Sequence, residues 1–175
     1  RSKIHPPAWR STWDWGLFVG GFVPPVVFGV AFGNLFQGVP FQFDEFLVPT
    51  YTGSFWALLN PFALLAGVVS SAMITLQGAT YLAHRTEGTV QARTVRAGTG
   101  AAVVMVLAFV AAGVWLQSID GFRISSSLDP GALPNPLAKT VVRAPGAWMH
   151  NFVVQPALWL LPMLGIAGAL AAAAL

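Results

Sequence analysis

The sequence predicts an all-α fold, a polytopic bundle of about four membrane-spanning helices. Hydrophobic residues make up 55% of the chain, charged residues only 9%, and the mean hydropathy is +0.67. An ordinary soluble domain carries about 25% charged residues. A soluble core in a chain of 175 residues cannot bury this much apolar surface. The composition therefore indicates a chain whose solvent is lipid.

Four apolar stretches, separated by polar segments, account for the predicted bundle. They lie near residues 15–36, 55–82, 97–117 and 152–175, and none contains Asp, Glu, Lys or Arg. Each provides the roughly 20 apolar residues that a spanning helix needs. Strands are excluded because the stretches are too long and an open sheet cannot satisfy its backbone in lipid. We predict a single membrane domain over residues 1–175.

Small residues recur at four-residue intervals in the first two stretches. The positions are Gly16, Gly20 and Pro24, then Gly29 and Gly33, then Ala63, Gly67 and Ser71. This spacing lets helix backbones approach closely in lipid, so we expect these ridges to pack against other helices. The alternative is that glycine is simply frequent in membrane helices. Pro24 and Pro25 are expected to kink the first helix, because two amide donors are missing.

The connecting segments alternate in charge, which predicts the topology. Segment 38–53 holds Asp44 and Glu45 without a positive charge, and segment 119–150 is long, mixed in charge and rich in proline. The N-terminal strip and segment 84–96 are basic through Arg1, Lys3, Arg10, Arg85, Arg93 and Arg96. With four spans these two basic segments share one side of the membrane. The positive-inside rule predicts that this side is the cytoplasm.

The candidate cofactor ligands do not form a site. The three histidines lie at predicted helix ends or in loops: His5, His84 and His150. A haem site in a bundle needs His or Met facing inward from within a helix. Met73 and Met105 lie within helices, but methionine commonly fills gaps. We predict no cofactor-binding residue and no metal ligand here, and expect His84 and Arg85 to cap the second helix dipole.

Asp14 is the acidic residue nearest to an apolar stretch, and it has two interpretations. At the membrane edge it suits a proton-relay carboxylate. Residues 11–14, STWD, also fit a capping box before an apolar run, which favours a helix start there. In that case Trp9, Trp13 and Trp15 are interfacial anchors.

The remaining polar groups do not identify a catalytic residue. Asp44 and Glu45 are adjacent loop acids that we expect to be solvated. Amides within or bordering the apolar stretches suit hydrogen bonds across helices, or to a quinone carbonyl or a water: Asn34, Gln37, Asn60 and Gln77. No phosphate loop, metal spacing or nucleophile triad is present. The absence of a basic stripe argues against nucleic acid as a partner, and the absence of cysteine excludes disulfides and thiolate sites.

Specific sequence segments indicate a protein family, which the composition alone does not. Residues 13–41, WDWGLFVGGFVPPVVFGVAFGNLFQGVPF, closely resemble subunit II of the cytochrome bd-type quinol oxidases, including the small subunit of the cyanide-insensitive branch. The resemblance continues through residues 58–82, LLNPFALLAGVVSSAMITLQGATYL. It weakens across residues 90–107 and returns at residues 112–115, AGVW, and 119–121, IDG. It covers nearly the whole chain.

The resemblance implies a function for a complex rather than for this chain alone. It implies a partner, oxidase subunit I, that holds b-type and d-type haems. The complex takes quinol from the quinone pool, reduces dioxygen to water and generates a proton-motive force. The implied location is the bacterial inner (cytoplasmic) membrane, in contact with membrane lipid. The chain is expected to be an internal fragment that supports assembly. The family's early helices, associated with proton or oxygen access, are not matched here, so no catalytic residue is carried over.

A secondary transporter or channel subunit is the competing interpretation. Transporters use broken helices as substrate sites, and Pro24-Pro25 together with the long segment 119–150 favours that class. It also predicts buried charges and an inverted repeat. The sequence shows neither. A purely structural membrane scaffold is a third interpretation, which overlaps with the oxidase subunit.

Overall fold

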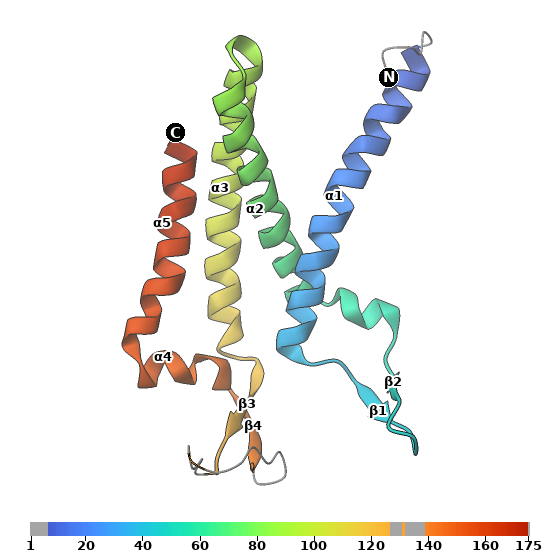
Figure 1. Cartoon of the computed structure of the whole chain (residues 1–175), viewed down its shortest axis with the longest axis vertical. Coiled ribbons are helices and arrows are strands. Elements are labelled where there is room, and N and C mark those ends of the chain that lie inside the picture. The colour runs from blue at the N-terminus through green and yellow to red at the C-terminus, as the bar shows by residue number, and fades with distance from the viewer. Residues whose placement is uncertain (1–6, 127–130, 132–138, 175) are drawn as a thin grey trace.

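The computed structural model describes residues 7–126, 131 and 139–174. Four segments are helical, long enough and apolar enough to cross a membrane. This confirms the prediction of an all-α polytopic bundle (Figure 1). The long helices are α1 (Pro7–Gln37), α2 (Pro61–Arg85), α3 (Gly88–Leu116) and α5 (Leu160–Ala174).

Two helices begin earlier than the sequence indicated. The first helix begins at Pro7 rather than near residue 15, so the capping-box interpretation of residues 11–14 is wrong: these residues lie inside α1. Proline is well suited to a first helical turn, where its missing N–H has no intrahelical partner. The third helix begins at Gly88 rather than near residue 97. Its polar first turns contain good helix formers such as Arg93, which polarity alone assigned to a loop.

The second apolar stretch is divided into two helical segments. It opens with a short 3₁₀ helix, η1 (Phe55–Leu59), and α2 then starts after Asn60. The Asn60 side chain accepts a hydrogen bond from the Ala63 backbone N–H at 2.9 Å, and Pro61 follows at the first helical position. Asparagine before proline is thus a local start signal for α2.

The fourth stretch is also interrupted. It follows a 3₁₀ turn, η3 (Ala147–Met149), and comprises α4 (His150–Val154), η4 (Pro156–Trp159) and α5. The interruption lies at Gln155, whose backbone leaves the helical region directly before Pro156. Proline disfavours a helical conformation in the residue before it, which explains the break. The expected single helix over 152–175 is therefore replaced by a short helix, a 3₁₀ turn and α5.

Two short antiparallel hairpins were not predicted. Strands β1 (Phe41–Phe43) and β2 (Pro49–Tyr51) pair in one, and β3 (Asp120–Ile124) and β4 (Val141–Pro145) pair in the other. Both lie at the end of the bundle opposite the two ends of the chain (Figure 1). Strands of three and five residues are too short to show a periodic pattern in the sequence.

Helix α2 is the centre of the bundle, with α1 on one side and α3 on the other, while α5 packs on α3. Helix α1 meets α2 near the hairpin end and diverges from it toward its own N-terminus (Figure 1). The buried core is small: Leu76, Ala102 and Ala169 form one cluster, with Met105 packed against it. Most large apolar side chains are exposed, as expected for helices that face lipid or further protein.

Four of the seven basic residues that the structure describes lie at one end of the bundle, and the other three, Arg123, Lys139 and Arg143, lie in or beside the β3–β4 hairpin. Arg10 lies in the first turns of α1, Arg85 ends α2, and Arg93 and Arg96 lie in the first turns of α3. These helix ends lie at the same end of the bundle, opposite the hairpins, although the start of α1 stands apart from the α2–α3 turn (Figure 1). Arg1 and Lys3 lie outside the described residues. The expectation that these segments share one side is confirmed for the described residues.

Candidate functional site

Helices α1 and α2 are in backbone contact at Gly29 and Gly33. A Cβ atom at Gly29 would collide with the Ala66 carbonyl oxygen and lie 2.5 Å from the Gly67 Cα atom. One at Gly33 would lie 2.5 Å from the Ala63 Cα atom. The predicted packing of this ridge, and of the matching small residues on α2, is confirmed.

The ridge of Gly16 and Gly20 has a different environment. Nothing within the described residues lies within 4 Å of a Cβ atom built at either position. Its neighbours are open as well: Leu17 is 68% exposed and Trp15 65%. Among the residues that the structure describes, none covers the apolar surface of the N-terminal half of α1.

Two amides, buried Asn34 and half-buried Asn60, join the end of α1 to the start of α2. The Asn34 side chain, only 8% exposed, donates through Nδ2 to the Val30 carbonyl at 2.8 Å and to the Leu58 carbonyl at 2.7 Å. Its Oδ1 accepts from Asn60 Nδ2 at 3.1 Å, and Asn60 Oδ1 caps α2 through the Ala63 N–H. These contacts confirm the structural interpretation for Asn34 and Asn60. We call this pair the asparagine clamp.

The other two candidate amides are not part of this network. The Gln37 Oε1 atom, at the end of α1, is buried and has no hydrogen-bond partner among the described residues. Gln77 is exposed on the surface of α2.

A large apolar cleft lies between α1, α2, α3 and α5. Its volume is about 1010 Å³. Apart from Ser70, Gln117 and the indole nitrogens of Trp148 and Trp159, the side chains that line it are apolar, and none is ionisable. It can hold apolar matter but offers no group for acid–base chemistry. Representative lining residues are Phe28, Phe32, Met73, Val110, Trp159 and Met163.

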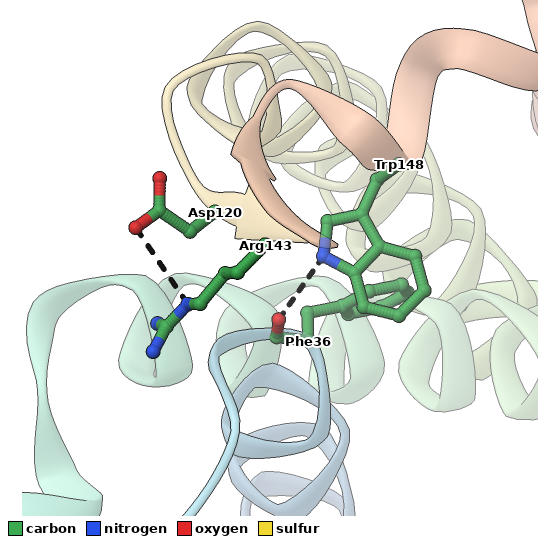
Figure 2. A network of polar contacts seen from close by, with 4 residues as sticks. All are labelled: Phe36, Asp120, Arg143 and Trp148. Atoms are coloured by element: carbon green, nitrogen blue, oxygen red, sulfur yellow. Dashed lines mark hydrogen bonds and ion pairs between the residues drawn. The ribbon is translucent and has the colours of Figure 1, made fainter. Parts of the chain in front are cut away.

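Trp148 lines the hairpin end of this cleft and fastens the β3–β4 hairpin to α1 (Figure 2). Its indole Nε1 donates to the Phe36 carbonyl at 3.1 Å, and its ring meets the Phe36 ring edge-on, with centroids 5.4 Å apart. Gly121 on β3 lies against the indole, where a Cβ atom would come within 2.9 Å of Cδ1. The role of Trp148 was not predicted from the sequence, because a tryptophan next to a membrane span suggests an interfacial anchor.

An ion pair joins the two strands of the same hairpin. Asp120 Oδ2 and Arg143 Nε are 3.6 Å apart (Figure 2). Both side chains are about half exposed, so the pair contributes little to stability. The ion pair joins the two strands to each other, whereas the contact of Trp148 with Phe36 joins the hairpin region to α1.

The histidines do not provide a haem site in the cleft. His84 lies in the last turn of α2, where its Nδ1 is 2.9 Å from the Thr80 carbonyl oxygen, and Arg85 lies beside it. This confirms their position at the C-terminal end of α2. His150 begins α4, and His5 lies outside the described residues. Neither His84 nor His150 is among the residues that line the cleft.

A haem fits these residues poorly. The common protein ligand sets for haem include histidine or an anionic thiolate or phenolate, with methionine as a second ligand. Met73 lines the cleft without a histidine there, and Met105 packs in the core as a gap-filler. Among the described residues no group of three or more His, Asp or Glu could hold a metal ion.

The acidic candidates differ in their roles. Asp14 lies within α1, two turns from its start, and not at a cap. Asp44 closes the β1–β2 turn, because its Oδ1 accepts from the backbone N–H groups of Phe46 at 2.9 Å and Val48 at 2.8 Å. Asp44 is exposed but has a local structural role, and Glu45 lies exposed beside it.

Comparison with known proteins agrees with the resemblance. The family model for cytochrome bd terminal oxidase subunit II matches residues 1–175. The chain belongs to this family. It is 56% identical over 167 residues to cytochrome bd-I ubiquinol oxidase subunit 2 of Escherichia coli (strain K12), a match that covers 95% of this chain and 44% of that protein.

Two further relatives also match most of this chain over less than half of their own length. The chain is 51% identical over 174 residues to the probable cytochrome oxidase subunit 2 of Haemophilus influenzae, covering 99% of the chain and 46% of the relative. It is 30% identical over 145 residues to cytochrome bd ubiquinol oxidase subunit 2 of Bacillus subtilis, covering 81% and 40%. The chain thus spans less than half the length of the curated relatives it matches.

Proposed function

We propose that this chain is the part of a cytochrome bd-type oxidase subunit II that helps to assemble a complex with a haem-bearing subunit I. In this complex quinol from the membrane pool is oxidised to quinone, dioxygen is reduced to water and a proton-motive force is generated. The family match over the whole chain carries this proposal. Three features of the described residues support a structural role for this chain. They are the close-packed glycines, the asparagine clamp and the apolar cleft without ionisable groups.

The described residues do not support the transporter or channel alternative. Helix α1 continues through Pro24 and Pro25 instead of breaking into two half-helices. Among the described residues the buried polar side chains are Asn34 and Ser71, neither of which is charged. A transporter site of the kind built from broken helices and buried charges therefore has no counterpart here.

The proposal predicts that this subunit carries no haem without its partner. The full-length subunit expressed alone is expected to be colourless, because its described histidines lie at helix ends and outside the cleft. Co-expressed with subunit I, the purified complex should show d-type and b-type haem in a reduced-minus-oxidised spectrum and should oxidise quinol. A stoichiometric b-type spectrum from the lone subunit that disappears in a His84→Ala or His150→Ala variant would contradict this assignment.

The charge pattern predicts the orientation in a bacterial inner membrane. The basic ends of α1, α2 and α3 should face the cytoplasm, and both hairpins should lie outside. Residues 1–175 contain no cysteine, so a full-length subunit whose remaining cysteines are replaced gives a clean background. An impermeant maleimide added to intact cells is expected to label Gln42→Cys on β1 but not Thr86→Cys at the α2–α3 turn. The reverse pattern would invert the topology.

A further inference from the structure

Two arginines lie on the outer side of α3, near the start of the helix. Arg93 and Arg96 are both exposed and lie three positions apart, so they are neighbours on one side of the helix. The other side of α3 packs on α2, where a Cβ atom added at Gly98 would lie 3.0 Å from the Ala79 Cβ atom. At 3.6 residues per turn, both arginines are about 140–160° around the helix from Gly98. They therefore lie on the side of α3 that faces away from α2.

An apolar stripe continues this side of α3 toward the hairpin end. Val103 and Leu107 follow Arg96 after seven and eleven residues, which returns to the same side of a helix, and they are 50% and 67% exposed. Leu107 is about 16 Å from Arg96 along the helix axis. Half of the hydrocarbon core of a bilayer is about 15 Å thick. We call Arg93, Arg96, Val103 and Leu107 the arginine face, which is cationic at one end and apolar over the depth of one leaflet.

The two arginines have no anionic partner within the part of the chain that the structure describes. Neither side chain forms an ion pair or a hydrogen bond with another described residue. Segment 84–96 contains three arginines and a single acid, Glu87. The Cβ atoms of residues three apart on a helix are about 5–6 Å from each other, so the two like charges repel. One phosphate group can accept charge-assisted hydrogen bonds from both guanidinium groups, which removes this repulsion.

The apolar part of the arginine face favours a phospholipid as the source of the phosphate. A free phosphate would satisfy the arginines but would leave Val103 and Leu107 without a partner. The helix contact inside this chain uses glycine and alanine, whereas Val103 and Leu107 are branched and do not allow backbones to approach closely. In the proposed orientation, Arg93 and Arg96 lie at the cytoplasmic leaflet, whose surface is negative because it contains anionic lipids.

We propose that the arginine face binds an anionic phospholipid, with the phosphate between Arg93 and Arg96 and one acyl chain along Val103 and Leu107. This inference goes beyond the proposed function, because it concerns the lipid around the subunit and not the oxidation of quinol. A zwitterionic phospholipid with the same chains binds more weakly, because its own ammonium group competes for the phosphate. Removing either arginine weakens the binding about fivefold, and removing both weakens it roughly 25-fold.

A photoactivatable lipid tests this proposal in the full-length subunit purified with subunit I. The probe is phosphatidylglycerol with a diazirine in one acyl chain, and phosphatidylcholine with the same chains is the comparison. The complex is placed in phosphatidylcholine nanodiscs with a small fraction of one probe, irradiated and digested for mass spectrometry. The peptide that contains Val103 and Leu107 is expected to carry several-fold more adduct with the anionic probe.

Single substitutions locate the headgroup. Arg93→Gln and Arg96→Gln should each lower the yield of this adduct about fivefold at a low concentration of the anionic probe. Arg85→Gln is the matched control, because it removes one charge at the same end of the bundle. Arg85 ends α2 and lies over the Tyr81 ring, 5.8 Å from its centroid. Its substitution should leave labelling of the α3 peptide near that of the parent.

Three outcomes would overturn the proposal. Equal labelling by the two probes would mean that bulk lipid merely solvates this side of α3. An equal loss in Arg85→Gln and Arg96→Gln would mean that the positive charge of the whole end attracts the probe. Cross-links from Leu107→benzoylphenylalanine mainly to subunit I, or to peptides outside residues 1–175, would mean that protein covers the face. The haem spectrum and quinol oxidase activity of each preparation test the proposed function separately, since a haem-free complex with selective labelling contradicts the function alone.

Discussion

Replacing Gly29 by alanine is expected to remove most of the assembled complex from the membrane. The added Cβ atom would collide with the Ala66 carbonyl and lie 2.5 Å from the Gly67 Cα atom, so the atoms that must move are backbone. Overpacking a close-packed site costs about 1–3 kcal/mol, and contact with the α2 backbone rather than with a flexible side chain favours the upper end. A loss of about 3 kcal/mol lowers an assembly equilibrium by roughly 100-fold.

Gly100 provides the matched control for this substitution. It lies within α3, and nothing among the described residues lies within 4 Å of a Cβ atom built there. Gly100→Ala should leave the yield of detergent-purified complex and its thermal midpoint near those of the parent. If Gly29→Ala matches Gly100→Ala in both measurements, α1 and α2 do not approach each other as closely as the structure indicates.

The spans were predictable because lipid imposes a strong and simple constraint. A helix that crosses the hydrocarbon needs a long uncharged stretch, and the four stretches read from the sequence all correspond to helices. Their ends were less predictable, because polarity marks the edge of the membrane rather than the end of a helix. Helix α3 extends through Arg93 and Arg96 well beyond its apolar part, and α1 includes Ser11 and Asp14.

The helix packing was only partly predictable, because the four-residue spacing of small residues does not specify which helix they contact. Gly16 with Gly20 and Gly29 with Gly33 show the same four-residue interval, yet among the described residues only the second pair contacts another helix. The difference arises from the direction of α1, which diverges from α2 toward its N-terminus (Figure 1). The contact between Trp148 and Phe36 joins residues 112 positions apart, and nothing local in the sequence reports such a pairing.

The asparagine clamp shows how a local signal and a long-range contact combine. The second helix was expected to start near residue 55, but the Asn60-Pro61 pair starts α2 in the structure. Its amide group has a second role, because Asn60 Nδ2 donates to Asn34 on α1. Asn34 in turn holds the Leu58 carbonyl at the end of η1. One capping residue therefore sets both where α2 begins and how it is held against α1.

Asn34→Leu is expected to destabilise the complex clearly, although leucine has a similar size. The change removes the donor to the Leu58 carbonyl and the acceptor of Asn60 Nδ2 in a half-buried site, and leaves Asn60 Nδ2 with a 3.5 Å contact to the Ala57 carbonyl. An unsatisfied buried group costs about 1–3 kcal/mol, although hydrogen bonds between membrane helices average nearer 0.6 kcal/mol. With two groups affected we expect about 2 kcal/mol, which is roughly a 30-fold lower assembly equilibrium and a lower thermal midpoint.

A double-mutant cycle separates the clamp from the helix cap. Asn60→Ser keeps an N-cap side chain for α2 but removes the amide that donates to Asn34. If the clamp stabilises the α1–α2 contact, Asn34→Leu should cost less in the Asn60→Ser background than in the parent. Gln77→Leu makes a similar amide-to-leucine change at an exposed position on α2. It should change the free energy of unfolding by only a few tenths of a kcal/mol. Equal effects of Asn34→Leu and Gln77→Leu, or strict additivity in the cycle, would show that the two asparagines do not act together.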